Sequence, residues 1–237
     1  MLTFHIITLF PKTFTSYLGE SIIARAIRDK KIAVKCYNPR DFTPHKLVKS
    51  ASGGSPGRQS RLRERVDRRP YGGGPGMVLE VSSVVRAVEK IYSLIRTNKR
   101  IGRSKIVLLS AGGKQFNNTY ARNVARKVTD LILVSGRYEG VDARVKKIFK
   151  AEELSVGPYV LTGGELPAAT MVDAIARFVP GVLGKAESLE ASRISSPEVY
   201  TRPEVLEWKK KKYKVPAVLL SGHHAKIDEW KKKLRGN

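Results

Sequence analysis

The chain is short of cysteine, of acidic residues and of long apolar runs, and each shortage narrows what it can be. Its single cysteine, Cys36, cannot form an intramolecular disulfide, which makes a cytoplasmic location the default expectation. No apolar run approaches the roughly 18 residues that a membrane span needs. The first segment, MLTFHIITLF, lacks the basic start and the small-residue cleavage site of a signal peptide. We therefore expect no membrane partner.

Acidic residues are strongly outnumbered by basic ones. The chain has 21 Asp and Glu against 45 Lys and Arg, a formal net charge of +24. Such an excess predicts a polyanionic partner, most simply a nucleic acid. The basic residues gather in residues 45–69 and 203–237. The alternative, that these segments are solvated and only aid solubility, is the weaker interpretation at this total charge.

The usual phosphate-binding motifs are also missing. The strand-like segment LTFHIITLF is not followed by G-x-G-x-x-G, and the chain contains no G-x-x-x-x-G-K-[ST]. Glycines gather instead in LLSAGG, LVSGRYEG and YVLTGGELP, each at the expected carboxyl end of a strand. In parallel sheets ligands bind at this edge. The three segments therefore predict one pocket, for a ligand that does not need phosphate-binding loops.

Apolar runs alternate with helical patterns, which predicts an α/β sandwich with a mostly parallel sheet. We expect strands at 2–10, 32–38, 105–110, 131–136 and near Leu154, and helices at 11–30, 81–96, 118–128 and 166–178. Cys36 is expected in the core. Residues 1–184 should form one domain, 185–197 a linker, and 198–237 a small, basic and mostly helical second domain.

A glycine-rich loop, RPYGGGPGMV, lies at residues 69–78. Its glycines and prolines are incompatible with a helix interior or a central strand. Strong secondary-structure signals stand on both sides, so the loop does not have the character of a linker. Its composition indicates that another group approaches the main chain so closely that side chains are excluded.

Longer motifs carry a family resemblance. RPYGGGPGM, SGRYEGVDARV, VGPYVLTGGELPA, DAIARFVPGVLG, YTRPEVLE and VLLSGHHAKI resemble the bacterial tRNA (guanine-N1)-methyltransferases of the TrmD type, in the SPOUT superfamily. The resemblance implies a SPOUT fold with a trefoil knot in the carboxyl-terminal part of the methyltransferase domain. It also implies a homodimer with the active site at the subunit interface. The expected reaction is methyl transfer from S-adenosyl-L-methionine to N1 of guanosine 37, directly 3′ of the anticodon in tRNA.

The resemblance also assigns the residues of the site. The cofactor would be bound by Ser110, Ala111, Gly112, Gly113, Gly136, Tyr138, Val156, Gly157, Tyr159, Leu161, Gly163, Gly164 and Pro167. The flipped-out guanine would be received by Asp67, Tyr71, Gly74, Pro75, Gly76 and Met77. Glu139 could accept from the guanine amino group, and Arg177 could stabilise negative charge on the guanine carbonyl oxygen. No metal site is assigned, and dependence on Mg²⁺ stays open.

The linker departs from the family pattern. Where family members carry an aspartate thought to act as general base, this chain has Ala191 or Ser192. Glu190 is the nearest carboxylate and becomes the candidate base, with Glu187 in reserve; the alternative is that Glu190 is simply solvated. Two other functions remain open: a different SPOUT RNA methyltransferase, and a knotted tRNA-binding protein that has lost its base.

Overall fold

The computed structural model describes residues 1–43, 66–97, 103–183 and 198–235. The chain divides into two compact units, Met1–Leu183 and Gly184–Asn237, which are described separately. The expected linker at 185–197, with the candidate base Glu190, lies outside the described residues. Within the described ranges no helix is long and apolar enough to cross a membrane.

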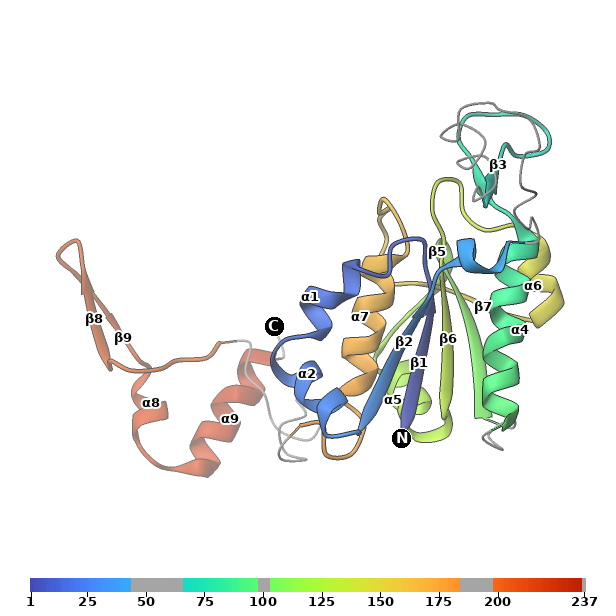
Figure 1. The fold of residues 1–237 in the computed structure, drawn as a ribbon. Helices are drawn as coiled ribbons and strands as arrows, with labels where there is room; N and C mark the ends of the chain where they lie inside the picture. The colour runs from blue at the N-terminus through green and yellow to red at the C-terminus, as the bar shows by residue number, and fades with distance from the viewer. Residues whose placement is uncertain (44–65, 98–102, 184–197, 236–237) are drawn as a thin grey trace, which may run out of the picture. The chain divides into compact units, whose positions relative to one another are not determined.

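The first unit is built on a five-stranded sheet in the order β2-β1-β6-β5-β7 (Figure 1). The strands are β1 (Leu2–Ile7), β2 (Ile32–Tyr37), β5 (Ser104–Gln115), β6 (Asp130–Ser135) and β7 (Glu152–Ser155). Each neighbouring pair is parallel, which confirms the expected sheet. β1 and β6 are buried at every position because both faces of the sheet are covered.

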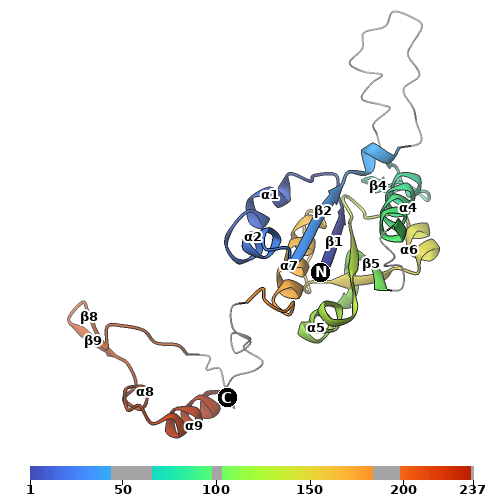
Figure 2. The same cartoon turned by 60° about the horizontal axis from the view of Figure 1, so that its bottom comes forward.

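Helices cover the two faces of the sheet (Figure 1 and Figure 2). One core lies under α1 (Thr13–Leu18), α2 (Ser21–Arg28), α5 (Asn118–Lys127) and α7 (Glu165–Ala176). The other lies under η1 (Pro39–Phe42), α4 (Val81–Thr97) and α6 (Ala143–Phe149). Successive strand residues serve the two cores in turn: Leu131 and Leu133 face the first, whereas Ile132 faces the second.

The region expected to be helical over residues 11–30 holds two helices, with Gly19 ending α1; a Cβ on Gly19 would lie 2.7 Å from the carbonyl oxygen of Thr15. One local expectation was wrong. Cys36 is exposed rather than part of the core. It lies on β2, whose position at the edge of the sheet leaves its side chains only partly covered.

Among the described residues of the second unit, the first secondary-structure element is a β-hairpin rather than a helix. Its strands are β8 (Val205–Trp208) and β9 (Lys211–Lys214), followed by α8 (Ala217–Leu220) and α9 (His224–Arg235). The expectation of a mostly helical unit overlooked this hairpin. Its two-residue turn, Lys209 and Lys210, carries none of the Gly, Asn or Asp residues that normally mark such a turn.

Candidate functional site

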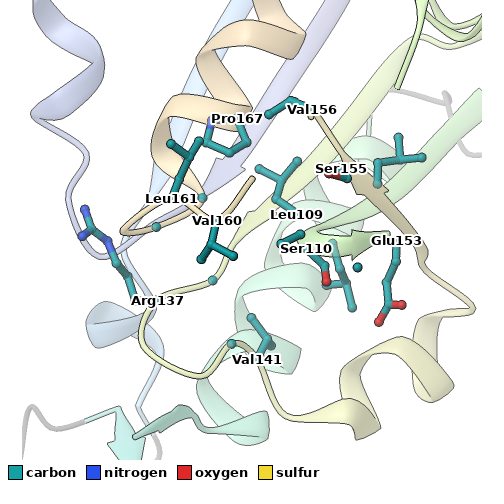
Figure 3. Close-up of a pocket in the computed structure, with 18 of the residues that line it drawn as sticks. Leu109, Ser110, Arg137, Val141, Glu153, Ser155, Val156, Val160, Leu161 and Pro167 are labelled. Atoms are coloured by element: carbon teal, nitrogen blue, oxygen red, sulfur yellow. The ribbon is translucent and has the colours of Figure 1, made fainter. Parts of the chain in front are cut away.

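A cavity of about 410 Å³ opens beside the carboxyl ends of β6 and β7 (Figure 3). Its volume lies in the range of small-molecule sites. Its walls come from residues 108–112, 136–141, 153–156 and 159–164, together with Pro167 of α7. All three glycine-bearing segments therefore line one cavity, as their positions in the sequence indicated.

Most of the predicted cofactor residues line this cavity: Ser110, Ala111, Gly112, Gly136, Tyr138, Val156, Tyr159, Leu161, Gly163, Gly164 and Pro167. Gly113 and Gly157 are not among the lining residues. A Cβ on Gly113 would lie 2.6 Å from the backbone nitrogen of Leu154, and one on Gly157 would overlap the ring of Tyr159. Packing against these neighbours accounts for both glycines, and cofactor binding by the whole set stays a prediction.

The wall formed by β5 depends on an irregularity in that strand. β5 runs to Gln115 rather than ending near residue 110 as expected. Leu109 and Lys114 both pair with Leu154 of β7, so the residues between them bulge out of the ladder. Such bulges redirect a strand next to binding sites. This one turns Ser110, Ala111 and Gly112 toward the cavity.

Gly164 allows α7 to begin directly against the end of β6. A Cβ on Gly164 would lie 2.6 Å from the Cα of Ser135. The Gly164 N–H donates to the carbonyl of Gly136 at 2.9 Å, and the Ser135 hydroxyl donates to the carbonyl of Gly164 at 3.2 Å. Only a residue without a side chain fits this approach, which brings Pro167 to the cavity wall.

An ion pair between the buried Glu165 and the partly exposed Arg137 lies beside the cavity. Glu165, 2% exposed in the first turn of α7, accepts from the Thr8 hydroxyl at 2.8 Å. Its other oxygen, Oε2, lies 2.9 Å from Nε of Arg137; by distance the two are an ion pair, but their geometry is not that of a hydrogen bond. Arg137 also lies 4.5 Å over the ring of Phe10 and donates to the carbonyl of Thr162 at 3.3 Å.

This pair therefore joins the segments that follow β1 and β6 to the segment that precedes α7. Neither Glu165 nor Arg137 was among the residues predicted for the site. The available signal was an acidic side chain in the first turn of an apolar helix, which the helix dipole favours but which also needs a partner when buried.

The glycine-rich loop is the tip of a short hairpin, β3 (Asp67–Arg68) paired with β4 (Val78–Leu79). The hairpin is joined to the cavity loop after β6. Glu139 N–H donates to the carbonyl of Met77 at 3.0 Å, and Leu79 N–H donates to the carbonyl of Gly140 at 3.0 Å. The composition of the loop indicated that another group approaches its main chain closely. At Gly76 this group is the side chain of Glu139.

The predicted guanine-binding residues lie next to the cavity rather than in its wall. Asp67, Tyr71, Gly74, Pro75, Gly76 and Met77 are not among the lining residues, although Glu139, which Gly76 and Met77 contact, does line it. Tyr71 is fully exposed at the hairpin tip. Binding of a substrate by these residues stays a prediction.

Arg177 is not near the cavity of its own chain. It caps the carboxyl end of α7, and the cavity lies at the amino end of that helix. The helix has 12 residues, which at about 1.5 Å per residue separates the two ends by roughly 18 Å. One chain therefore does not bring Arg177 and Glu139 together.

Asp142 directly follows Val141, the last cavity-lining residue of the loop after β6. Its side chain caps α6 by accepting from the Arg144 N–H at 2.9 Å, and the Arg144 guanidinium binds both of its oxygens. The hydrogen bond from the Arg144 side chain holds the pKa of the Asp142 carboxyl below its usual value. Among the described residues no group of three His, Cys, Asp or Glu side chains is placed to hold a metal ion.

Comparison with known proteins places the chain among tRNA methyltransferases. Residues 2–237 match the family model "tRNA (Guanine-1)-methyltransferase TrmD". A "tRNA (guanine-N(1)-)-methyltransferase" of Clostridioides difficile (strain 630) is 40% identical over 233 residues, covering 97% of this chain and 90% of the relative.

A relative of the same name in Haemophilus ducreyi (strain 35000HP / ATCC 700724) is 42% identical over 231 residues, covering 95% of this chain and 83% of the relative. The crystal structure of tRNA (m1G37) methyltransferase from Aquifex aeolicus superposes with a TM-score of 0.72 at 33% identity. That superposition covers 99% of this chain and 89% of the other.

Proposed function

This chain belongs to the TrmD family of tRNA (guanine-1)-methyltransferases, and from that premise we propose that it methylates N1 of guanosine 37 in tRNA, in the cytoplasm. The methyl donor would be S-adenosyl-L-methionine. The observation that carries the proposal is the cavity at the strand ends, which the family's own glycine-rich motifs line and at whose edge Glu139 lies.

The cavity offers a ligand both apolar and polar contacts. Its wall combines main chain and apolar side chains, including Val156, Leu161 and Pro167, with polar side chains such as Arg137, Glu139 and Glu153. A Cβ on Gly112 would meet no atom within 4 Å, so the main chain there borders open space into which a ligand can fit. S-adenosylmethionine supplies the methyl group, on a sulfonium that departs as a neutral thioether.

The chain's own residues would handle the guanine and its proton. As the N1–carbon bond forms, the proton on N1 must pass to a base, and Glu190 is the proposed acceptor. Glu139 would hold the guanine amino group by accepting from it, and Arg177 would stabilise negative charge on the carbonyl oxygen. These roles account for why a carboxylate lies between the glycine loop and the cavity.

The position of Arg177 supports a site shared between two subunits. Within one chain α7 separates it from the cavity by roughly 18 Å, so a second copy must supply it if it acts on the same guanine. We also propose that the chain is knotted as in the SPOUT fold. The loop after β6 contacts the segment before α7 through the bridge between Arg137 and Gly163 and the hydrogen bond from the Gly164 N–H to the Gly136 carbonyl, and these contacts support the proposal.

Subunit complementation tests the shared site. Arg177→Ala and Glu139→Ala homodimers should each be inactive. Random mixing of the two should restore about a quarter of the wild-type sites, because half the dimers are mixed and each mixed dimer has one intact site. If both residues act within one chain, the mixture stays inactive.

We propose that the second unit, residues 198–237, binds tRNA through its lysines. Replacing Lys209 to Lys212 together with alanine should flatten the dependence of tRNA affinity on salt, since each phosphate contact releases counterions. An unchanged slope would make the lysine run a solvated face only.

The function itself is tested by methylation with labelled S-adenosylmethionine, followed by digestion of the tRNA. 1-Methylguanosine at position 37 is the expected product. Another methylated nucleoside would favour a different SPOUT RNA methyltransferase. Binding of tRNA without turnover would favour the alternative of a knotted tRNA-binding protein that has lost its general base. Activity measured with and without EDTA decides whether Mg²⁺ takes part.

A further inference from the structure

The hairpin β8–β9 exposes an apolar face. Every residue of its two strands is exposed. The register pairs Leu206 with Tyr213 and Trp208 with Lys211, and side chains two apart on a strand share a face. Leu206, Trp208 and Tyr213 therefore lie together on one face, and each is more than half exposed. A two-stranded hairpin is barely stable alone, so such a face indicates a partner.

The charge around this face identifies the partner's chemistry. Lys209, Lys210, Lys211, Lys212 and Lys214 stand in or next to the hairpin turn, against the single acid Glu207. The Nζ of Lys209 lies 4.5 Å over the ring of Trp208. A second copy of this chain, with its net charge of +24, is a poor electrostatic match for such a surface. A polyanion that also presents flat apolar faces, which is RNA with unpaired bases, matches both features.

The turn adds an independent observation. Lys209 and Lys210 take φ values of 49° and 62°, in the left-handed region. A two-residue turn of this kind favours Asn-Gly, and lysine is disfavoured there because its Cβ crowds the following carbonyl oxygen. The turn thus carries two charged side chains at a conformational cost, which indicates that the charges serve something other than the turn itself.

We propose that the hairpin Val205–Lys214 is a stacking platform: Trp208 and Tyr213 hold unpaired bases of the tRNA while the surrounding lysines neutralise its phosphates. The inference rests on the proposed function in one respect only, which is that the RNA bound by the hairpin is tRNA. Stacking and charge neutralisation leave different signatures, because stacking on an aromatic ring does not depend on released counterions. The two contributions can therefore be measured separately on one hairpin.

The first experiment uses fluorescence. The chain has two tryptophans, so Trp230→Phe leaves Trp208 as the sole reporter. Titration with unmodified tRNA should quench its emission, and a fully base-paired RNA duplex should quench it far less. No quenching by tRNA would overturn the proposal. A blue shift with vesicles of anionic phospholipid, without quenching by tRNA, would also overturn it and assign the face to a membrane surface.

The second experiment uses affinity across a salt series. Trp208→Ala should weaken tRNA binding by about 5- to 100-fold at every salt concentration, with the slope of log Kd against log salt unchanged. Trp208→Phe should keep most of the affinity. The matched control is Val205→Ala, which removes an exposed apolar side chain from the opposite face and should change neither quantity.

The third variant separates binding from folding. Lys209→Asn with Lys210→Gly installs the residues that this turn prefers, so the hairpin should be at least as stable. It should nevertheless lower the salt slope by up to about two units, because two phosphate contacts are lost. The proposal would be overturned if this double variant kept its affinity and salt slope and Trp208→Ala also kept its affinity. Since every readout is of binding, absence of methylation would contradict the proposed function and leave this inference standing.

Discussion

The carboxylate of Glu139 occupies the space that a side chain on Gly76 would need. A Cβ built on Gly76 would lie 2.6 Å from Glu139 Oε1, and the φ of Gly76, +85°, also disfavours any other residue. The glycine loop and the loop after β6 are thus fitted to each other at this point. Glu139 lies between the glycine loop and the cavity because nothing larger than a hydrogen atom stands opposite it.

Gly76→Ala should therefore lower methylation more than backbone strain alone would. The methyl group must displace Glu139, and small misplacements at a site can lower the rate by tenfold or more, up to about a hundredfold. Gly73→Ala is the matched control, since Gly73 has a similar φ, +82°, but open space around it. Comparison of kcat/KM for the two variants checks the prediction. Equal losses in both would mean that only the backbone conformation matters.

Two glycines of the cavity wall should respond differently to valine. Gly112→Val places its side chain where no atom lies within 4 Å, so it should block S-adenosylmethionine binding and leave thermal unfolding unchanged. Gly164→Val would drive a side chain into the backbone of Ser135, 2.6 Å away, and should lower the unfolding temperature as well. Calorimetric titration and thermal unfolding separate the two effects. Wild-type affinity in folded Gly112→Val would remove the β5 bulge from the site.

Glu165→Gln should destabilise the first unit. The amide keeps the shape and the hydrogen bond from Thr8 but leaves the Arg137 guanidinium without its counter-charge. Breaking a fully buried pair costs about 3–5 kcal/mol, and because Arg137 is partly exposed the loss should fall below that range. Glu153→Gln, which breaks the more exposed pair with Lys146, should cost at most about 1 kcal/mol. Denaturant unfolding measures both, and equal losses would contradict the prediction.

Stability should fall as the pH drops below about 6.5, through His5. Its ring lies 3.0 Å from the Tyr37 hydroxyl and 3.1 Å from Asp130, and burial, outweighing Asp130, lowers its pKa. Because the unfolded chain then takes up the proton at a higher pH than the folded chain, protonation favours unfolding. His5→Gln should flatten the fall between pH 7 and about pH 5.5, as followed by urea unfolding. The same slope in the variant would assign the titration to another group.

The sequence by itself determined the layered α/β fold and the family. Apolar runs such as LILVS can be stable only where both faces of a strand are covered, so they specify a parallel sheet between helices. Glycines at strand ends indicated a single cavity, because the carboxyl ends of parallel strands meet at one edge. Long motifs such as SGRYEGVDARV identified the family because their order and spacing rarely arise by chance.

Only the tertiary structure decided which distant residues meet. Gly76 and Glu139 are far apart in sequence, and no local pattern records that one excludes a side chain from the other. Likewise, the register shift of β5, the partner of buried Glu165 and the separation of Arg177 from the cavity depend on how packed elements align. Residue patterns report local conformation and burial, whereas close approach between loops is fixed by the packing of the elements that carry them.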